Sequence, residues 1–195
     1  MTQAPRLKLN IGCGFDKKPG WINVDQFATC DPDQILDIEE IPWPWPDDSA
    51  DEVLLSHVLE HVGTSPKNYL AIIKEIWRVC CDGARIEIRL PHPRHDYFLI
   101  DPTHVRAIHP RSFEHFSQKR NREWQAVGSP ATPLGLYLGI DFDVEGIQQV
   151  LAPKWAERVR NGELSQTEIR DKMEDMNNVV MEFTVILKAV KPHGS

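Results

Sequence analysis

A glycine turn followed by an acid is the first feature of this sequence that could do chemistry. Gly12, Cys13 and Gly14 follow a short run of β-favouring residues, and glycine allows both a tight turn and the close approach of a ligand to the backbone. Asp25 ends the next such run, where a carboxylate could accept hydrogen bonds from both hydroxyls of a ribose. The pattern predicts a nucleotide ligand. A turn that merely needs positive φ is the alternative, and the missing third glycine argues against a dinucleotide.

A second chemical pattern is the string HVLEH at positions 57–61. It has the HxxEH spacing of inverzincin metallopeptidases, in which two histidines on one helix face bind zinc and the glutamate is the base. By that alternative, His57 and His61 bind the metal and Glu60 serves as base. Because the string directly follows a predicted strand and has no identifiable third ligand, two other interpretations stay open. One is a turn with hydrogen-bonded histidines, and the other is the wall of a cofactor pocket.

The elements that must position these residues can be predicted from the spacing of apolar residues. Short strands are expected at 7–11, 21–24, 35–38 and 52–56, and an alternating run predicts another over 84–90. Ser65 as N-cap and Pro66 at the first helical position predict a helix that Gly83 ends. A strand, helix and strand core of this kind is typical of an α/β protein, in which ligands bind at the carboxyl ends of the strands.

The second half of the chain has fewer clear patterns. A helix is expected to begin near Ser112, and a strand is expected over 136–142. Ser165 and Glu168 match a capping box and predict a helix that the pair Asn177 and Asn178 closes. A long strand rich in Val, Ile and Phe is expected over 179–190.

Composition limits the partners of the protein. The 195 residues carry a formal net charge of −7, with 41% apolar and 26% charged residues, which fits one globular domain. The basic residues are dispersed, which argues against a nucleic-acid partner, and no apolar run is long enough for a membrane helix. We predict a cytoplasmic protein, since no secretory signal is evident and the cysteines lack CxxC spacing. The four expected reduced thiols are Cys13, Cys30, Cys80 and Cys81. The sequence does not indicate the oligomeric state.

The chain resembles the class I S-adenosylmethionine-dependent methyltransferases, in particular the small bacterial ones. The resembling stretches are LKLNIGCGFDKKPGWINVD, QILDIEEIPWPWPDDSADEVLLSHVLEHV, the following helix with the strand ending LPHPRHD, and the final VVMEFTVILKAVK. The resemblance implies S-adenosyl-L-methionine as cofactor and one domain over residues 1–195. It also implies a Rossmann-like sheet that is mostly parallel, with a C-terminal antiparallel strand and helices on both faces.

The resemblance further implies which residues hold the cofactor. Gly12, Cys13 and Gly14 would lie against the methionine part, and Asp25 would hold the ribose. Asn10 stands where the family usually has Asp or Glu, so a charged contact is replaced by a neutral one. The segment 15–20 is also short and leaves little room for a first long helix.

Four more cofactor residues follow from the same resemblance. Asp37 with Ile38, after the third strand, would take the adenine amino group and ring. Ser56 and His57 would end the fourth strand beside the methyl group. These residues and the preceding ones would therefore form one site at the carboxyl edge of the sheet.

The histidine-rich loop after the fifth strand is expected to supply the base. Methyl transfer to oxygen or nitrogen requires alignment of the acceptor and removal of a proton, which suits histidine. His95 or His92 is the predicted base, with Asp96 orienting the ring, and His104 with Asp101 is the next candidate. One alternative is a surface loop with incidental histidines. Another is a divalent metal bound by His92, His95, Asp96 and His104.

The sequence therefore predicts an enzyme that transfers the methyl group of S-adenosylmethionine to an oxygen or nitrogen of a small-molecule acceptor, for example a sugar-derived metabolite. Residues 111–178 are expected to form a lid or insertion that selects the acceptor. Two alternatives remain at this point. One is a zinc-dependent hydrolase that uses His57, Glu60 and His61, and the other is a cofactor-binding protein without catalysis.

Overall fold

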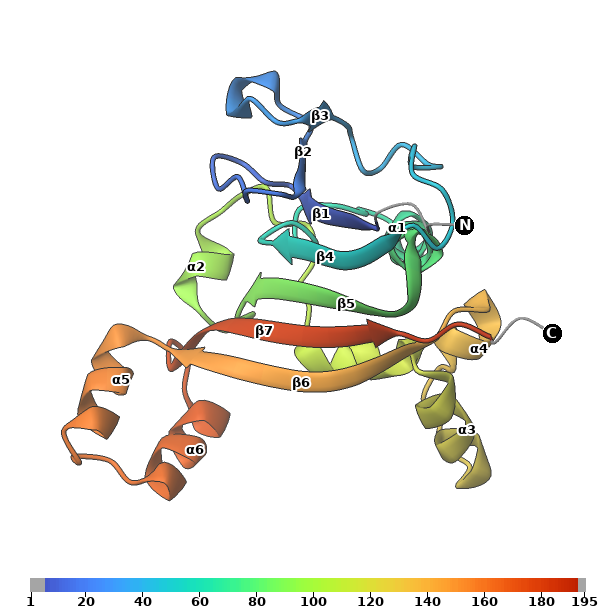
Figure 1. The fold of residues 1–195 in the computed structure, drawn as a ribbon. Coiled ribbons are helices and arrows are strands. Elements are labelled where there is room, and N and C mark those ends of the chain that lie inside the picture. The colour runs from blue at the N-terminus through green and yellow to red at the C-terminus, as the bar shows by residue number, and fades with distance from the viewer. Residues whose placement is uncertain (1–5, 193–195) are drawn as a thin grey trace.

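The computed structural model describes residues 6–192, which form one seven-stranded sheet in the order β3-β2-β1-β4-β5-β7-β6 (Figure 1). The parallel strands are β1 (Leu7–Ile11), β2 (Ile22–Asp25), β3 (Gln34–Ile35), β4 (Ala50–Ser56) and β5 (Cys80–Pro91). β7 (Val180–Ala189) runs antiparallel to β5 and to the edge strand β6 (Phe142–Leu151). The predicted Rossmann-like, mostly parallel sheet with a C-terminal antiparallel strand is confirmed.

Helix α1 (Pro66–Val79) begins as predicted, because the Ser65 hydroxyl accepts a hydrogen bond from the backbone N–H of Asn68 at 3.1 Å. The predicted end at Gly83 is wrong. The helix ends at Val79, and the chain enters β5 at once. Gly83 has a φ of +78° and lies where the pairing of β5 with β4 shifts register. The glycine therefore permits the irregular backbone at this point of the strand.

The other helices are short: α2 (Asp96–Leu99), a 3-10 helix (Pro110–Phe116), α3 (Gln118–Ala126), α4 (Leu134–Leu138), α5 (Pro153–Arg160) and α6 (Gln166–Asp175), with a 3-10 turn at Ala28–Cys30. The capping box of Ser165 and Glu168 is confirmed at α6. The strand expected over 136–142 is wrong, because α4 occupies its first three residues and β6 begins only at its last residue, Phe142. Gly139 ends α4 in the left-handed region, and β6 begins after it. No helix that the structure describes is long and apolar enough to cross a membrane.

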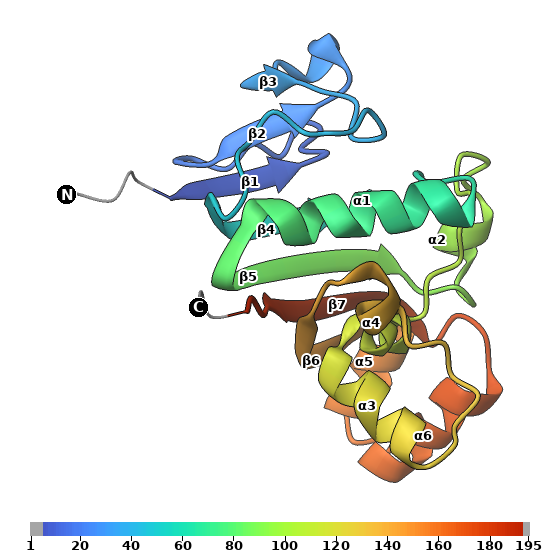
Figure 2. The same ribbon diagram turned by 90° about the vertical axis from the view of Figure 1, so that its right-hand side faces the viewer.

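The main core lies between one face of the sheet and α1, which runs alongside β4 and β5 (Figure 2). It contains alternate residues of the central strands, the buried face of α1 and the 3-10 helix: Leu9, Ile11, Val53, Leu55, Ile72, Ile73, Ile76, Ile86, Ile88, Phe113 and Phe116. This packing holds the strands in register, so the positions of their carboxyl ends are fixed relative to one another.

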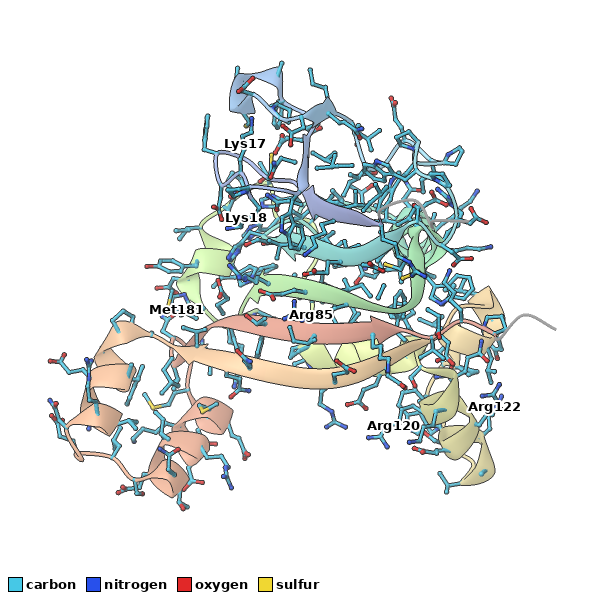
Figure 3. All side chains as sticks on the ribbon, viewed as in Figure 1. Lys17, Lys18, Arg85, Arg120, Arg122 and Met181 are labelled. Atoms are coloured by element: carbon cyan, nitrogen blue, oxygen red, sulfur yellow. The ribbon has the colours of Figure 1, made fainter. Side chains whose placement is uncertain are left out.

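The helices surround the sheet unevenly. Figure 1 views β4, β5, β7 and β6 from a face that no helix crosses, and Arg85 points out from this face in Figure 3. Glu87 lies between Arg85 and Arg89 there, with an ion pair of 2.7 Å to each. Paired charges therefore cover part of this face in place of an apolar layer.

The segment 15–20 forms turns instead of a first long helix, as expected.

Candidate functional site

The carboxyl ends of the parallel strands and the loops after them enclose a cavity of about 440 Å³. This is the edge of an α/β sheet at which ligands are expected to bind. The lining residues are Gly12, Asp25, Gln26, Phe27, Leu36, Asp37, Ile38, Glu39, His57, Val58, His61, Val62 and Thr103.

The structure brings some of the expected cofactor residues to this cavity and leaves others outside it. Those that line it are Gly12, Asp25, Asp37, Ile38 and His57, whereas Asn10, Cys13, Gly14 and Ser56 do not. The pattern did not single out the flanking residues Gln26, Phe27, Leu36, Glu39 and Val62. Their only signal was their place beside the predicted strand ends.

Asn10 holds a turn instead of facing the cavity. Its side chain is buried, and its amide group donates hydrogen bonds of 2.9 Å to the backbone oxygen of Asp16 and to Asn23 Oδ1. Asn23 Oδ1 also accepts from the backbone N–H of Lys18 at 2.7 Å. The contact of Asn10 with the cofactor stays a prediction, while the structure shows its side chain bonded within the turn. Its role is to fasten the 15–20 segment to β1 and β2.

Asp25 is held in place by the backbone around it. Its Oδ2 accepts a hydrogen bond from the N–H of Gly14 at 2.8 Å, and its Oδ1 accepts from the N–H of Phe27 at 3.0 Å. Each carboxylate oxygen can accept a further hydrogen bond. Because two backbone groups fix its orientation, Asp25 can bind a pair of hydroxyl groups without first losing side-chain freedom.

Gly12 is required by the close approach of two segments. Its φ is +65°, and a Cβ atom at this position would lie 2.4 Å from Val58 Cγ2. No larger residue fits there unless Val58 moves. The glycine turn thus forms a tight cradle between β1 and the segment after β4, which is the local structure that a ligand lying against backbone needs.

The charges of the cavity favour a cationic ligand. Asp25, Asp37 and Glu39 contribute three carboxyl groups, and the lining residues include no lysine or arginine. Asp37 and Glu39 are exposed at its edge, while Phe27, Leu36 and Ile38 add apolar surface beside them. This combination suits a ligand that joins a flat apolar ring, hydroxyl groups and a positive charge.

The HVLEH string forms a turn and not a helix. His57 has a φ of +56°, so it does not share a helix face with His61, and the geometry of the zinc-dependent hydrolase is absent. The His57 ring lies between two carboxylates, with Nδ1 at 3.3 Å from Glu60 Oε1 and Nε2 at 2.8 Å from Glu182 Oε2. The contact with Glu60, together with that of Glu182, raises the pKa of His57 against the effect of burial.

The hydrogen bonds of two predicted bases, His92 and His95, leave neither ring a free nitrogen to accept a proton. Nδ1 of His92 accepts from the backbone N–H of Arg94 at 2.9 Å, and Nδ1 of His95 accepts from the N–H of Tyr97 at 3.1 Å. Each neutral ring then carries its hydrogen on Nε2 and has no free lone pair. Burial and the nearby Arg94 also lower the pKa of His92 to about 4. This geometry argues against either ring as the base.

His95 and Asp96 instead belong to helix α2. His95 is its N-cap residue and is buried. Asp96 makes no hydrogen bond to His95 within the described chain, and its backbone N–H donates to Asn178 Oδ1 at 2.8 Å. Neither residue lines the cavity, and in the structure they form a helix cap and a link to the segment after α6.

His61 and His104 have the opposite arrangement. His104 Nδ1 donates to the backbone oxygen of Phe98 at 2.8 Å. The Thr103 hydroxyl donates to Asp101 Oδ1 at 2.6 Å, so its oxygen accepts from His61 Nδ1 at 2.8 Å. Both rings therefore have a free lone pair on Nε2. The expected bond between His104 and Asp101 is absent, since Nε2 and Oδ2 lie 4.0 Å apart.

The metal site considered as an alternative for the histidine loop is not assembled. His92, His95, Asp96 and His104 do not converge; within residues 6–192, the only set of at least three potential ligands that comes together is Glu60, His61 and His104. The sequence signal for His61 was its place in the HVLEH string. The participation of His104 depends on the path of a loop that the sequence did not predict.

Comparisons with known proteins agree with this fold. Residues 13–88 match the family model described as a methyltransferase domain. A SAM-dependent methyltransferase from Archaeoglobus fulgidus is 20% identical, with a TM-score of 0.60 over 94% of this chain and 86% of that one. A SAM-dependent methyltransferase from Methanosarcina mazei is 16% identical, with a TM-score of 0.51 over 98% and 95% of the two chains. No curated protein matches the sequence.

The sheet order and the matched domain give the chain the Rossmann-like methyltransferase fold, with a cavity at the carboxyl edge of its sheet. Residues 13–88, which match the methyltransferase-domain model, lie within this fold, and both similar structures are SAM-dependent methyltransferases.

Proposed function

We propose that this enzyme transfers the methyl group of S-adenosylmethionine to an oxygen or nitrogen of a small-molecule acceptor. The observation that carries the proposal is the acidic cavity at the carboxyl edge, where the tight turn at Gly12 meets the fixed carboxylate of Asp25. The cofactor has a sulfonium and an ammonium group, and a cavity lined by three carboxyl groups and by no lysine or arginine suits them.

We place the cofactor by the chemistry of the lining residues. Asp25 accepts hydrogen bonds from the ribose hydroxyls, and the backbone at Gly12 lies against the methionine part. Asp37 and Ile38 bind the adenine amino group and ring. His57 lies beside the methyl group. The support for this arrangement is that all five residues line the same cavity.

We infer that the acceptor binds in a second cavity of about 530 Å³ near the same edge. Its walls come from the segment after β5, from β6 and β7, and from α6: His92, Arg94, His109, Gln149, Gln166, Ile169, Arg170, Met173, Glu174, Val180 and Phe183. Gln149, Gln166 and Arg170 offer hydrogen-bonding groups that suit a hydroxyl-rich, sugar-derived acceptor. In this arrangement residues of the 111–178 range select the acceptor, and His92 can orient it by donating a hydrogen bond from Nε2.

We also infer a cytoplasmic location. Cys13, Cys30, Cys80 and Cys81 are all free thiols, as a reducing compartment would keep them.

Asp25→Ala should weaken binding of S-adenosylhomocysteine by about 1.5 to 3 kcal/mol, because hydrogen bonds to a charged group typically contribute that much. Isothermal titration of the full chain measures the effect. Thermal unfolding of the same variant shows how much stability is lost with the bonds to Gly14 and Phe27. Asp33→Ala is the matched control, since this carboxylate also accepts backbone and side-chain bonds from Asn23 but does not line the cavity. Equal affinity in wild type and a folded Asp25→Ala protein would refute the ribose assignment.

Arg170→Ala should lower kcat/KM for the acceptor by about tenfold or more, the loss expected for a hydrogen bond to a charged group, and should leave the affinity for S-adenosylhomocysteine unchanged. Product formation from a panel of sugar-derived and other small acceptors identifies a substrate for this measurement. Arg160→Ala is the control, because this exposed arginine of α5 lies outside both cavities. If both variants keep the wild-type kcat/KM, the second cavity is not the acceptor site.

A further inference from the structure

Glu60 is a buried carboxylate without a hydrogen bond. Its exposed fraction is 1%, and neither carboxylate oxygen has a hydrogen-bond partner in the described part of the chain. Its one ion-pair contact among the described residues is with the His57 ring, whose Nδ1 lies 3.3 Å from Oε1. A buried charge with unfilled hydrogen-bonding capacity is costly. A bound cation in direct contact with the Glu60 carboxylate would lower this cost.

Two imidazole nitrogens converge on the same point as this carboxylate. One ligand atom each from Glu60, His61 and His104 lies within 4.8 Å of the others. As shown above, the hydrogen bonds to Thr103 and to the Phe98 oxygen leave a free lone pair on Nε2 of both histidines. We propose that Glu60, His61 and His104 bind a divalent transition-metal ion at the wall of the cofactor cavity.

The donor set determines the class of ion. Two imidazoles and one carboxylate suit first-row divalent ions such as Zn²⁺, whereas Mg²⁺ and Ca²⁺ prefer oxygen ligands throughout. The ligands also have the outer contacts that orient metal-binding histidines. Asp101 accepts a hydrogen bond from Thr103, and Thr103 accepts one from His61. The backbone oxygen of Phe98 accepts a hydrogen bond from His104 and orients its ring.

Such an ion would join two segments that pack against each other. The backbone oxygen of Glu60 accepts hydrogen bonds from the N–H groups of Val105 at 2.8 Å and Arg106 at 3.2 Å. The ion would add a second link between this turn and the loop that carries His104. Three protein ligands leave at least one position open, and His61 and Thr103 line the cavity. The inference goes beyond the proposed methyl transfer, because metal binding needs neither cofactor nor acceptor.

The test is titration of the full chain, stripped of metal with a chelator, against ZnCl₂ in competition with a chromophoric chelator. We expect one zinc per chain. Glu60→Gln and His104→Gln should each weaken binding by more than about 100-fold, because changes to outer contacts alone cost about 10- to 100-fold. Thr103→Val removes the partner of His61 with little change in shape and should weaken binding about tenfold. His115→Gln is the control, since its ring lies outside the group of ligands.

Thermal unfolding gives a second measurement, because the melting temperature of Glu60→Gln relative to the wild type should depend on whether zinc is present. Without metal, Glu60→Gln should match or exceed the melting temperature of the wild type, because it removes a buried carboxylate whose oxygens accept no hydrogen bond. With excess zinc, the wild type should melt higher and Glu60→Gln should not respond. The proposal is overturned if the wild type binds no zinc, or if it binds zinc no more tightly than folded Glu60→Gln and His104→Gln.

Discussion

Gly12→Ala should reduce cofactor affinity below detection and destabilise the protein by about 2 to 5 kcal/mol. The left-handed backbone conformation costs a non-glycine residue about 1 to 2 kcal/mol, and an overpacked contact costs about 1 to 3 kcal/mol more. The contact is severe, because the new Cβ would lie 2.4 Å from Val58 Cγ2. Titration with S-adenosylhomocysteine and denaturant unfolding measure the two effects.

Gly14→Ala separates the two causes. Gly14 also has a positive φ, of +48°, but a Cβ there meets nothing within 4 Å, so this variant should show the backbone cost alone. The double variant Gly12→Ala with Val58→Ala should recover part of the stability, because the second change removes the clashing methyl groups. If Gly12→Ala has the affinity and stability of Gly14→Ala, the turn is not the tight cradle that we describe.

Arg78→Met should destabilise the protein by about 3 to 5 kcal/mol at neutral pH, the usual cost of removing one partner of a buried ion pair. Arg78 donates from Nε and Nη2 to the two carboxylate oxygens of Glu75, each at 2.8 Å. It also donates to the backbone oxygens of Trp43 and Trp45. The substitution leaves Glu75 buried without its counterion and releases the loop at 41–47. Denaturant unfolding measures the loss.

The pH dependence of the free energy of unfolding provides a second test of this ion pair. Burial raises the pKa of Glu75, but the hydrogen bonds from Arg78 and from the Trp43 N–H outweigh it, so the pKa is lowered in the folded protein. A lowered carboxyl pKa adds stability above the unfolded value, near 4.3, and this stability is lost as the pH falls through the folded value. The difference between wild type and Arg78→Met should therefore shrink on acidification.

Arg158→Met is the matched control for the ion pair. Arg158 contacts Glu163 at 3.3 Å, but both side chains are well exposed, and such surface pairs contribute about 0 to 1 kcal/mol. A loss in Arg78→Met that is no larger than in Arg158→Met would contradict the anchoring role. Arg78→Met should also weaken cofactor binding modestly, because the segment it anchors continues from Asp37 and Glu39 at the cavity wall.

Local patterns were sufficient for the strands and helices that have strong signals. The run at 7–11 became β1, the Ser65 cap began α1, the capping box at Ser165 began α6, and the C-terminal run became β7. Each of these signals depends on a few neighbouring residues. The strand expected over 136–142 failed because its apolar residues are equally compatible with the short helix α4, and tertiary packing decides between them.

The sequence by itself determined that glycine and acidic residues follow several strands. These residues lie together at one edge of the sheet, because the carboxyl ends of parallel strands meet there. That placed Gly12, Asp25, Asp37, Ile38 and His57 in one cavity. Only the tertiary structure decided the roles of the histidines. A ring's free nitrogen depends on which backbone group or hydroxyl lies beside the other nitrogen, and loops from distant parts of the chain supply those partners. For that reason the loop carrying His104 meets the turn carrying Glu60 and His61, while His95 serves as a helix cap.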